Sequence, residues 1–181
     1  NTDKTRAILI TGAGRGFCSG ADLTQGLRDP EQDLLDNYLP FVEAIVDSNV
    51  PVVTAVNGIA AGAGMSLALL GDYVVAGESA SFLQAFVNIG LVPDAGSSYL
   101  LPRLIGRARA NEVMMLGEKL PAAKAFDWGM INRVVADEVL MDEAIKVATK
   151  FANGPTVSLK GIRTLSHDSH NNTFYDQFKL E

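Results

Sequence analysis

Residues 52–64, VVTAVNGIAAGAG, place a short apolar run directly before a turn made almost entirely of small residues. Residues 7–23, AILITGAGRGFCSGADL, follow the same order, since an apolar run leads into a turn rich in Gly and Ala. Apolar runs bounded by turn signals are typical of strands buried on both faces of a parallel sheet. Small residues leave backbone N–H groups uncovered, so two such turns that face each other can hold one developing negative oxygen. The pattern indicates chemistry on a carbonyl group.

The composition limits the kind of protein that this chain can be. With 181 residues, of which 48% are apolar, the chain can bury one core, and a second complete domain is not expected. The formal net charge of −6 and the pI near 4.9 argue against nucleic acid or an anionic membrane as the main partner. The single cysteine, Cys18, excludes an internal disulfide framework and suits a reducing compartment, so we expect a cytoplasmic location.

The sequence shows neither a membrane span nor a secretion signal. No apolar run approaches the roughly 20 residues that a membrane-spanning helix needs, so we expect a soluble protein. No basic stretch precedes an apolar one at the start of the sequence. The first residues, NTDK, look like the interior of a longer chain, which leaves open an organellar targeting segment upstream.

The rest of the chain alternates between predicted helices and strands. Apolar residues between positions 34 and 46 recur at helical spacing, and Pro40 predicts a break or a late helix start. Asp137 is predicted to cap the last helix of the core. Strands alternating with helices indicate the α/β class. We expect helices at residues 65–70, 95–105, 108–116, 121–129 and 140–151. We expect strands at residues 73–76 and 131–135.

The first turn has one alternative interpretation, a dinucleotide-binding loop, because Gly12 and Gly14 follow a strand. The third glycine of that fingerprint falls at position 17, where close packing of helix on strand demands Gly and the chain has Phe17. A nicotinamide cofactor is therefore disfavoured. A single turn of small residues often has no role beyond connecting two elements, so the functional interpretation depends on the presence of both turns.

Three segments carry a more specific resemblance: FCSGADL at residues 17–23, NGIAAGAG at 57–64 and GLVPDAG at 90–96. In order and spacing, together with LPR at 101–103 and GRA at 106–108, they resemble the enoyl-CoA hydratase/isomerase (crotonase) superfamily. The resemblance covers nearly the whole chain. It implies an α/β, crotonase-like fold of repeated ββα units around a parallel core sheet, incomplete at both termini.

The resemblance also implies an organisation and partners. Residues 1–154 would form the core domain, and residues 155–181 the start of a C-terminal helical region that serves oligomerisation into a homotrimer or hexamer. The expected substrate is an acyl-CoA thioester of fatty acid or phenylacetate metabolism, with coenzyme A as part of the substrate and no separate cofactor. No metal is implied, because His167 and His170 lack a third ligand at suitable spacing.

Site residues follow from the same resemblance. The backbone N–H groups of Ala21 and Ala63 are expected to form an oxyanion hole for the thioester carbonyl. Residues in and after the two turns are expected to bind the substrate and its coenzyme A moiety: Phe17, Ser19, Gly20, Asp22, Leu23, Gly62, Gly64, Ser66 and Phe86.

The acids of the family point to one kind of reaction. Hydratases of the superfamily activate water with two glutamates, and those positions are Ser66 and Phe86 here, so hydration is disfavoured. Several isomerases of the superfamily carry their working carboxylate at the position of Asp94. One carboxylate can take a proton from one carbon and return it two carbons away while the hole holds the dienolate. Packing by Phe82 and Phe86 is expected to raise the pKa of this acid.

Asp94 is thus the predicted catalytic acid/base of an isomerase, which shifts a double bond or rearranges a ring epoxide of an unsaturated or aryl-acetyl-CoA. Three alternatives stay open. Asp94 follows a turn and precedes a predicted helix, so its role can be that of a helix cap. The protein can be an enoyl-CoA hydratase, a lyase whose acid comes from a segment outside this sequence. It can also be a family member that binds acyl-CoA without turning it over.

Overall fold

The predicted strands form a parallel sheet. The structure is a computed structural model that describes residues 4–22 and 30–181. The sheet has the order β1-β2-β4-β7, with all neighbours parallel. The register pairs Ile8 with Val52 and Val53 with Tyr73. The strands are β1 (Ile8–Thr11), β2 (Val52–Val56), β4 (Tyr73–Gly77) and β7 (Arg133–Val135).

A second, smaller sheet continues the chain beyond β2 and β4. Its order is β3-β5-β6, in which β3 and β5 are parallel and β6 is antiparallel to β5. Its strands are β3 (Ile59–Ala61), β5 (Ser81–Leu83) and β6 (Leu120–Pro121). The order β2, β3, helix and then β4, β5, helix confirms the predicted ββα repeat.

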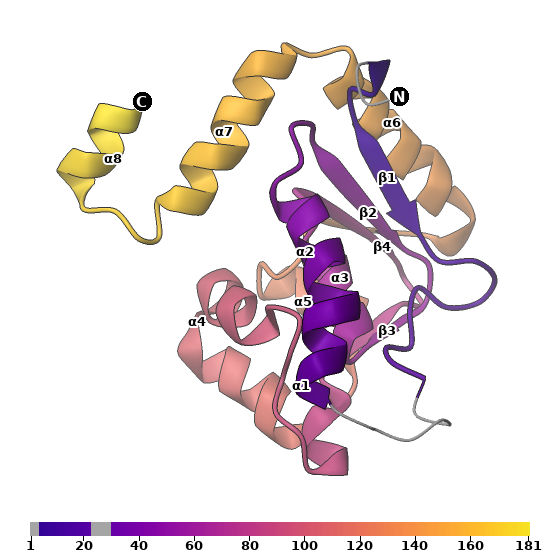
Figure 1. Cartoon of the computed structure of the whole chain (residues 1–181). Coiled ribbons are helices and arrows are strands. Elements are labelled where there is room, and N and C mark those ends of the chain that lie inside the picture. The colour runs from indigo at the N-terminus through magenta and orange to yellow at the C-terminus, as the bar shows by residue number, and fades with distance from the viewer. Residues whose placement is uncertain (1–3, 23–29) are drawn as a thin grey trace.

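Helices cover both faces of the main sheet (Figure 1). On one face, α6 packs on Val53, Ala55 and Val75. On the other face, α3, α4 and α5 pack around Val56 and Ala76. The helical elements are α1 (Pro30–Asp33), η3 (Leu34–Tyr38), α2 (Leu39–Val46), α3 (Ala63–Leu69), η4 (Ala85–Ile89), α4 (Ser97–Leu116), α5 (Ala122–Asp127), η5 (Asp137–Val139), α6 (Leu140–Ala152), α7 (Thr156–Asp168) and α8 (Phe174–Leu180).

The prediction for Pro40 is confirmed in part. The α-helix α2 begins late, at Leu39, with Pro40 in its first turn, but the chain does not break there, because the turn before it is also helical. Just before it, η3 is a π-helical turn in which the Leu39 N–H bonds to the Leu34 carbonyl. Proline has no N–H and its ring crowds the preceding turn, and the wider π turn supplies the room that an α turn lacks.

Two predicted helix starts also differ from the structure. The helix expected from residue 95 begins at Ser97, because Ala95 and Gly96 have φ angles of +46° and +89°, which no right-handed helix contains. Asp137 does not cap α6, whose flanking residue Val139 makes no side-chain cap. The Asp137 carboxylate instead accepts a hydrogen bond from the Ser79 N–H at 3.0 Å. Hydrogen bonding to the Ser79 side chain, and then to this N–H, lowers the pKa of Asp137.

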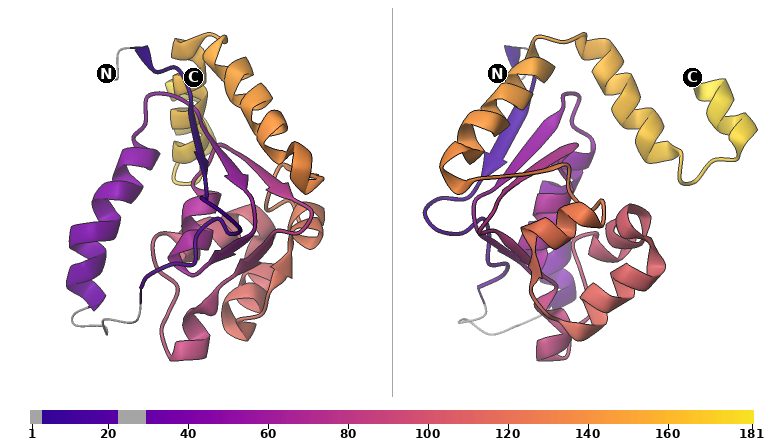
Figure 2. Two further views of the ribbon diagram at one scale, coloured as in Figure 1. Left: turned by 90° about the vertical axis from the view of Figure 1, so that its right-hand side faces the viewer. Right: turned by 180° about the vertical axis from the view of Figure 1, so that it is seen from behind.

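The last two helices leave the body of the protein. Figures 1 and 2 show α7 running out from the end of α6, with α8 beyond it. Neither helix contains a buried residue. The prediction that residues 155–181 serve oligomerisation stays a prediction.

No helix within residues 4–22 and 30–181 combines the length and the apolar composition that a membrane crossing requires.

One arginine ties α7 to the core. The Arg163 side chain is 12% exposed, and its Nε lies 2.7 and 2.6 Å from the two carboxylate oxygens of Asp72. Its other nitrogens donate to the carbonyls of Ile45, Val46 and Ser48, where α2 ends. Arg163 therefore satisfies carbonyls that the end of a helix leaves without partners.

We expect Arg163→Ala to lower the free energy of unfolding by about 2 kcal/mol, the scale of a hydrogen bond to a charged group. Urea denaturation at neutral pH measures it. Lys160→Ala, at an exposed position of the same helix, is the control and should change stability by less than about 0.5 kcal/mol. Equal stabilities of the two variants would contradict the anchoring role of Arg163.

Candidate active site

The two small-residue turns lie side by side. Cys18 and Ala60 form an isolated parallel bridge, in which the Ala61 N–H bonds to the Cys18 carbonyl at 2.9 Å. The Phe17 N–H bonds to the Ile59 carbonyl at 3.0 Å. Parallel pairing of the segments that precede both turns brings the turns to the same edge, as the sequence predicted.

Glycine is required at two positions of this junction. A Cβ on Gly64 would lie well within 3.0 Å of the Cys18 carbonyl carbon and oxygen. Gly20 has a φ angle of +89°, and a Cβ there would lie 2.9 Å from the Ala61 oxygen and 3.6 Å from the Ala63 nitrogen. The second distance shows that the Gly20 turn approaches the start of α3 closely.

We expect Gly64→Ala to separate the turns, lower the free energy of unfolding by about 1–3 kcal/mol and reduce turnover, because the new methyl group must displace the Cys18 backbone. Thermal unfolding and steady-state kinetics measure the two effects. Gly16→Ala is a matched control in the same segment, since its Cβ would meet only ordinary contacts, the nearest at 3.5 Å. If Gly64→Ala were as stable and active as Gly16→Ala, the close pairing of the turns would have no role.

The backbone amides of the two predicted oxyanion donors have no backbone acceptor in the described part of the chain. Ala63 is the first residue of α3, so its N–H has no partner within the helix. Neither Ala21 nor Ala63 donates a backbone hydrogen bond to any residue that the structure describes. Ala63 and Gly20 line the same cavity. Their binding of a thioester oxygen stays a prediction.

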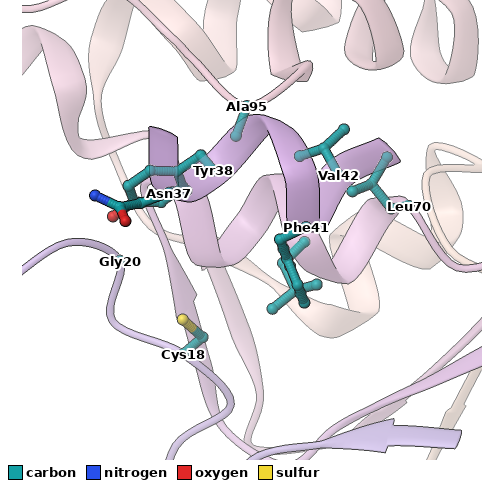
Figure 3. Close-up of a pocket in the computed structure, with 10 residues that line it drawn as sticks. Cys18, Gly20, Asn37, Tyr38, Phe41, Val42, Leu70 and Ala95 are labelled. Atoms are coloured by element: carbon teal, nitrogen blue, oxygen red, sulfur yellow. The ribbon is translucent and has the colours of Figure 1, made fainter. Parts of the chain in front are cut away.

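A cavity of about 230 Å³ lies between the turns and the helix that includes Pro40. Figure 3 shows Cys18 and Gly20 on one side and Tyr38, Phe41 and Val42 on the helix opposite. The wall is mostly apolar, which suits the acyl part of a substrate. The lining residues are Cys18, Gly20, Asn37, Tyr38, Phe41, Val42, Ala63, Leu67, Leu70 and Ala95.

Asp94 lies beside this cavity, next to the lining residue Ala95. Its Oδ1 is buried and has no hydrogen-bond partner in the described part of the chain. Burial raises the pKa of the carboxyl above its ordinary value of 3.8, as predicted. The helix-cap alternative was wrong, because Gly96 flanks α4 and no side chain caps it. One carboxylate oxygen is thus buried and unpaired, which is typical of an acid that transfers protons.

The predicted substrate-binding residues differ in how accessible they are. In the first turn, Ser19 and Asp22 are exposed, and Gly20 is partly exposed. Phe17 and Phe86 are each 7% exposed, and Phe86 packs near Gly62, so neither phenyl ring lines the cavity. Leu23 lies outside the described residues. The assignment of these residues to the substrate stays a prediction.

Ser66 is fully buried beneath the Asp94 turn. Its hydroxyl lies 3.1 Å from the Asp94 carbonyl oxygen and contacts the hydroxyl of Ser97. The Ser97 hydroxyl lies 2.9 Å from the same carbonyl and 3.0 Å from the Gln84 Nε2. Ser66 and Gln84 therefore supply no acid or base to the cavity, and instead hold the backbone that carries Asp94.

Tyr38 is a cavity residue that the sequence analysis missed. Burial raises the pKa of its phenol, and the charges of Asp33 and Asp94 raise it further, so the hydroxyl stays neutral. Tyr38 lines the cavity together with Ala95, the residue that follows Asp94. Tyr38 lies within the helix predicted between positions 34 and 46, but only the position of η3 and α2 against the turns shows that their face lines the cavity.

The histidines do not form a centre with the site. His167 stacks on Tyr99 at a centroid distance of 6.3 Å, and neither His167 nor His170 is among the residues that line the cavity. Within residues 4–22 and 30–181, no three His, Cys, Asp or Glu side chains gather as metal ligands.

Comparisons with known proteins agree on one family. The chain matches the model of the enoyl-CoA hydratase/isomerase family over residues 1–181. It is 45% identical to the 1,2-epoxyphenylacetyl-CoA isomerase of Escherichia coli, over 99% of this chain and 71% of that protein. A probable enoyl-CoA hydratase of Rhodobacter capsulatus is 41% identical, over 98% and 70%. The crystal structure of a putative enoyl-CoA hydratase/isomerase from Mycobacterium abscessus superposes with a TM-score of 0.92 at 37% identity, over 97% of this chain and 70% of that chain.

Proposed function

The chain belongs to the enoyl-CoA hydratase/isomerase family, and from that membership we propose that it is an acyl-CoA isomerase. It shifts a double bond, or rearranges a ring epoxide, of an unsaturated or aryl-acetyl-CoA thioester through an oxyanion-stabilised enolate. The family and the crotonase-like fold confirm the resemblance that the three sequence segments carried. Activity on acyl-CoA is common to the names of the relatives, whereas the type of reaction differs among them.

One observation carries the proposal: the only acid found at the cavity edge with a buried, unpaired oxygen is Asp94, among the residues that the structure describes. The ten residues that line the cavity include no Asp or Glu. The positions of the two hydratase glutamates hold Ser66 and Phe86, which are both buried. A single acid suits proton transfer between two carbons better than the activation of water by two carboxylates.

The reaction that we propose uses Asp94 twice. Its carboxylate takes a proton from the carbon next to the thioester carbonyl, and the released electron pair moves onto the thioester oxygen. The N–H groups of Ala21 and Ala63 stabilise that oxygen as its charge develops. Asp94 then returns the proton two carbons farther along the acyl chain, the carbonyl re-forms, and the double bond has moved.

The size of the cavity limits the acyl group. The cavity volume of about 230 Å³ lies just below the range that is usual for ligand pockets, which suits a phenyl ring with a short linker or a medium aliphatic chain. The name of the Escherichia coli relative, which specifies an epoxyphenylacetyl group, supports the aromatic choice.

A hydratase is the second candidate, and the name of the Rhodobacter capsulatus relative favours it. Carnitinyl-CoA dehydratases are also similar, at 34% identity for the Proteus mirabilis protein over 97% of this chain and 68% of that protein.

For assembly we propose a homotrimer or hexamer, in which the exposed Phe174, Tyr175 and Phe178 of α8 become buried.

Product analysis separates the two reactions. The protein is incubated with a 3-enoyl-CoA, an unsaturated aryl-acetyl-CoA and a 2-enoyl-CoA, and the products are identified by chromatography and mass. We expect isomers of unchanged mass from the first two and little hydration of the third. Faster addition of water to the 2-enoyl-CoA than isomerisation of either other substrate would establish the hydratase instead. Binding of all three without turnover would establish a non-catalytic protein.

A further inference from the structure

Asp94 does not hold its own position through its side chain. Its Oδ1 is buried without a partner, and no hydrogen bond to the carboxylate is found within the described residues. The turn that carries it is also strained, because Ala95 has a φ angle of +46° and left-handed backbone costs a non-glycine residue about 1–2 kcal/mol. The direction of the carboxylate must therefore be set by what holds the Asp94 backbone.

The Asp94 carbonyl is held from two sides. From α4, the Ser97 N–H and the Ser97 hydroxyl lie 3.0 and 2.9 Å from it. From α3, the Ser66 hydroxyl lies 3.1 Å from it. Gln84 donates its Nε2 to the Ser97 hydroxyl at 3.0 Å. Ser66, Ser97 and Gln84 are all 0% exposed, so water does not compete for these bonds.

Ser66 differs from the other two members because of its helix. It lies three residues after Ala63 in α3, within one helical turn of the predicted oxyanion donor. A helical turn is rigid, so the Ser66 hydroxyl is fixed relative to the Ala63 N–H. Ser66 is the member of this buried network that joins the helix of the donor to the turn of the acid.

We infer that Ser66 is a positioning residue, whose hydroxyl holds the Asp94 carboxylate at the correct distance from the Ala63 amide for proton transfer next to the bound carbonyl. The inference rests on the proposed function, since it gives Asp94 and Ala63 the roles proposed above. It assigns to Ser66 neither proton transfer nor contact with the substrate.

The test is Ser66→Ala, which removes the hydroxyl with little change of volume. We expect kcat to fall about 10- to 100-fold, because a small misplacement of a catalytic group has effects of this size. KM, the affinity for a saturated acyl-CoA, and the infrared shift of its bound thioester carbonyl should not change, because both amides remain. Ser98→Ala, at an exposed position of α4, is the control and should match the wild type.

A double-mutant cycle shows whether Ser66 acts through Asp94. In the Asp94→Asn background we expect Ser66→Ala to cause no further loss, because residues that act as a unit are not additive. An unchanged kcat in Ser66→Ala, or the same loss in both backgrounds, would overturn the inference. If Asp94→Asn alone were as active as the wild type, the proposed function would fail first. Should Ser66→Ala not fold, Ser66→Cys keeps the volume with a weaker donor, and the same outcomes apply.

Discussion

Replacing Asp94 by Asn is expected to lower kcat about 10²- to 10⁴-fold, the range that one general acid/base contributes. The amide has nearly the shape of the carboxyl group but cannot take a proton from carbon. Steady-state kinetics with a 3-enoyl-CoA measure the loss. The affinity for a saturated acyl-CoA should stay near the wild-type value, because the cavity is lined by other residues.

The same substitution should not destabilise the protein at neutral pH. Burial raises the folded-state pKa of Asp94 above its ordinary value of 3.8, so the folded state holds this proton more tightly than the unfolded state. Stability from this group is complete below pH 3.8 and is lost as the pH rises through the raised pKa. At neutral pH the charged side chain therefore opposes folding, and Asp94→Asn should unfold at the same or a higher urea concentration.

Asp127→Asn is the matched control, because Asp127 is exposed at the end of α5. It should leave both turnover and stability near the wild type. Loss of turnover that came with loss of stability in Asp94→Asn would indicate a structural role for Asp94. Turnover equal to that of Asp127→Asn would show that Asp94 is not the base.

Replacing Ala63 by Pro is expected to lower kcat about 10²- to 10³-fold, the cost of removing one oxyanion donor. Proline removes the N–H and places its ring where the oxygen would bind. Proline is well tolerated at the first position of a helix, which is the position of Ala63 in α3. Gly62, with φ 55° and ψ −129°, has no Cβ to clash with the ring.

Ala63→Gly keeps the N–H and serves as the control. It should retain activity to within a few-fold, since the side chain of residue 63 takes no part in the chemistry. Circular dichroism and thermal unfolding check that the proline variant is folded. A folded Ala63→Pro protein with the turnover of Ala63→Gly would show that this amide does not stabilise the oxyanion.

The strands and the two turns could be predicted from sequence because their signal is local. A run such as Val52–Val56 is buried on both faces whichever elements cover it, and glycine is required where two backbones meet, as at Gly64. The family segments added the positions of Ala63 and Asp94. The raised pKa of Asp94 was predictable for the same reason, since apolar residues surround its segment.

The remaining features depend on contacts between distant segments. Tyr38 lines the cavity only because the π turn before Pro40 and the packing of α2 direct that helix face toward the turns. Ser66 was predicted to contact the substrate, yet its hydroxyl bonds to the Asp94 carbonyl, 28 positions away. Asp137 was predicted as a local cap, but it bonds to Ser79 across the sheet edge. No local pattern distinguishes these outcomes.

The central claim is that Asp94 moves one proton between two carbons of a bound acyl-CoA. The most direct test is turnover of a 3-enoyl-CoA in deuterium oxide by the wild type and by Asp94→Asn, followed by mass analysis of substrate and product. We expect the wild type to form the 2-enoyl isomer with little deuterium at the newly protonated carbon, because Asp94 returns the proton that it took, and the variant to bind the substrate without isomerisation. Full deuteration of that carbon in the wild-type product, wild-type turnover by the variant, or a wild-type product that has gained one water molecule would contradict the claim.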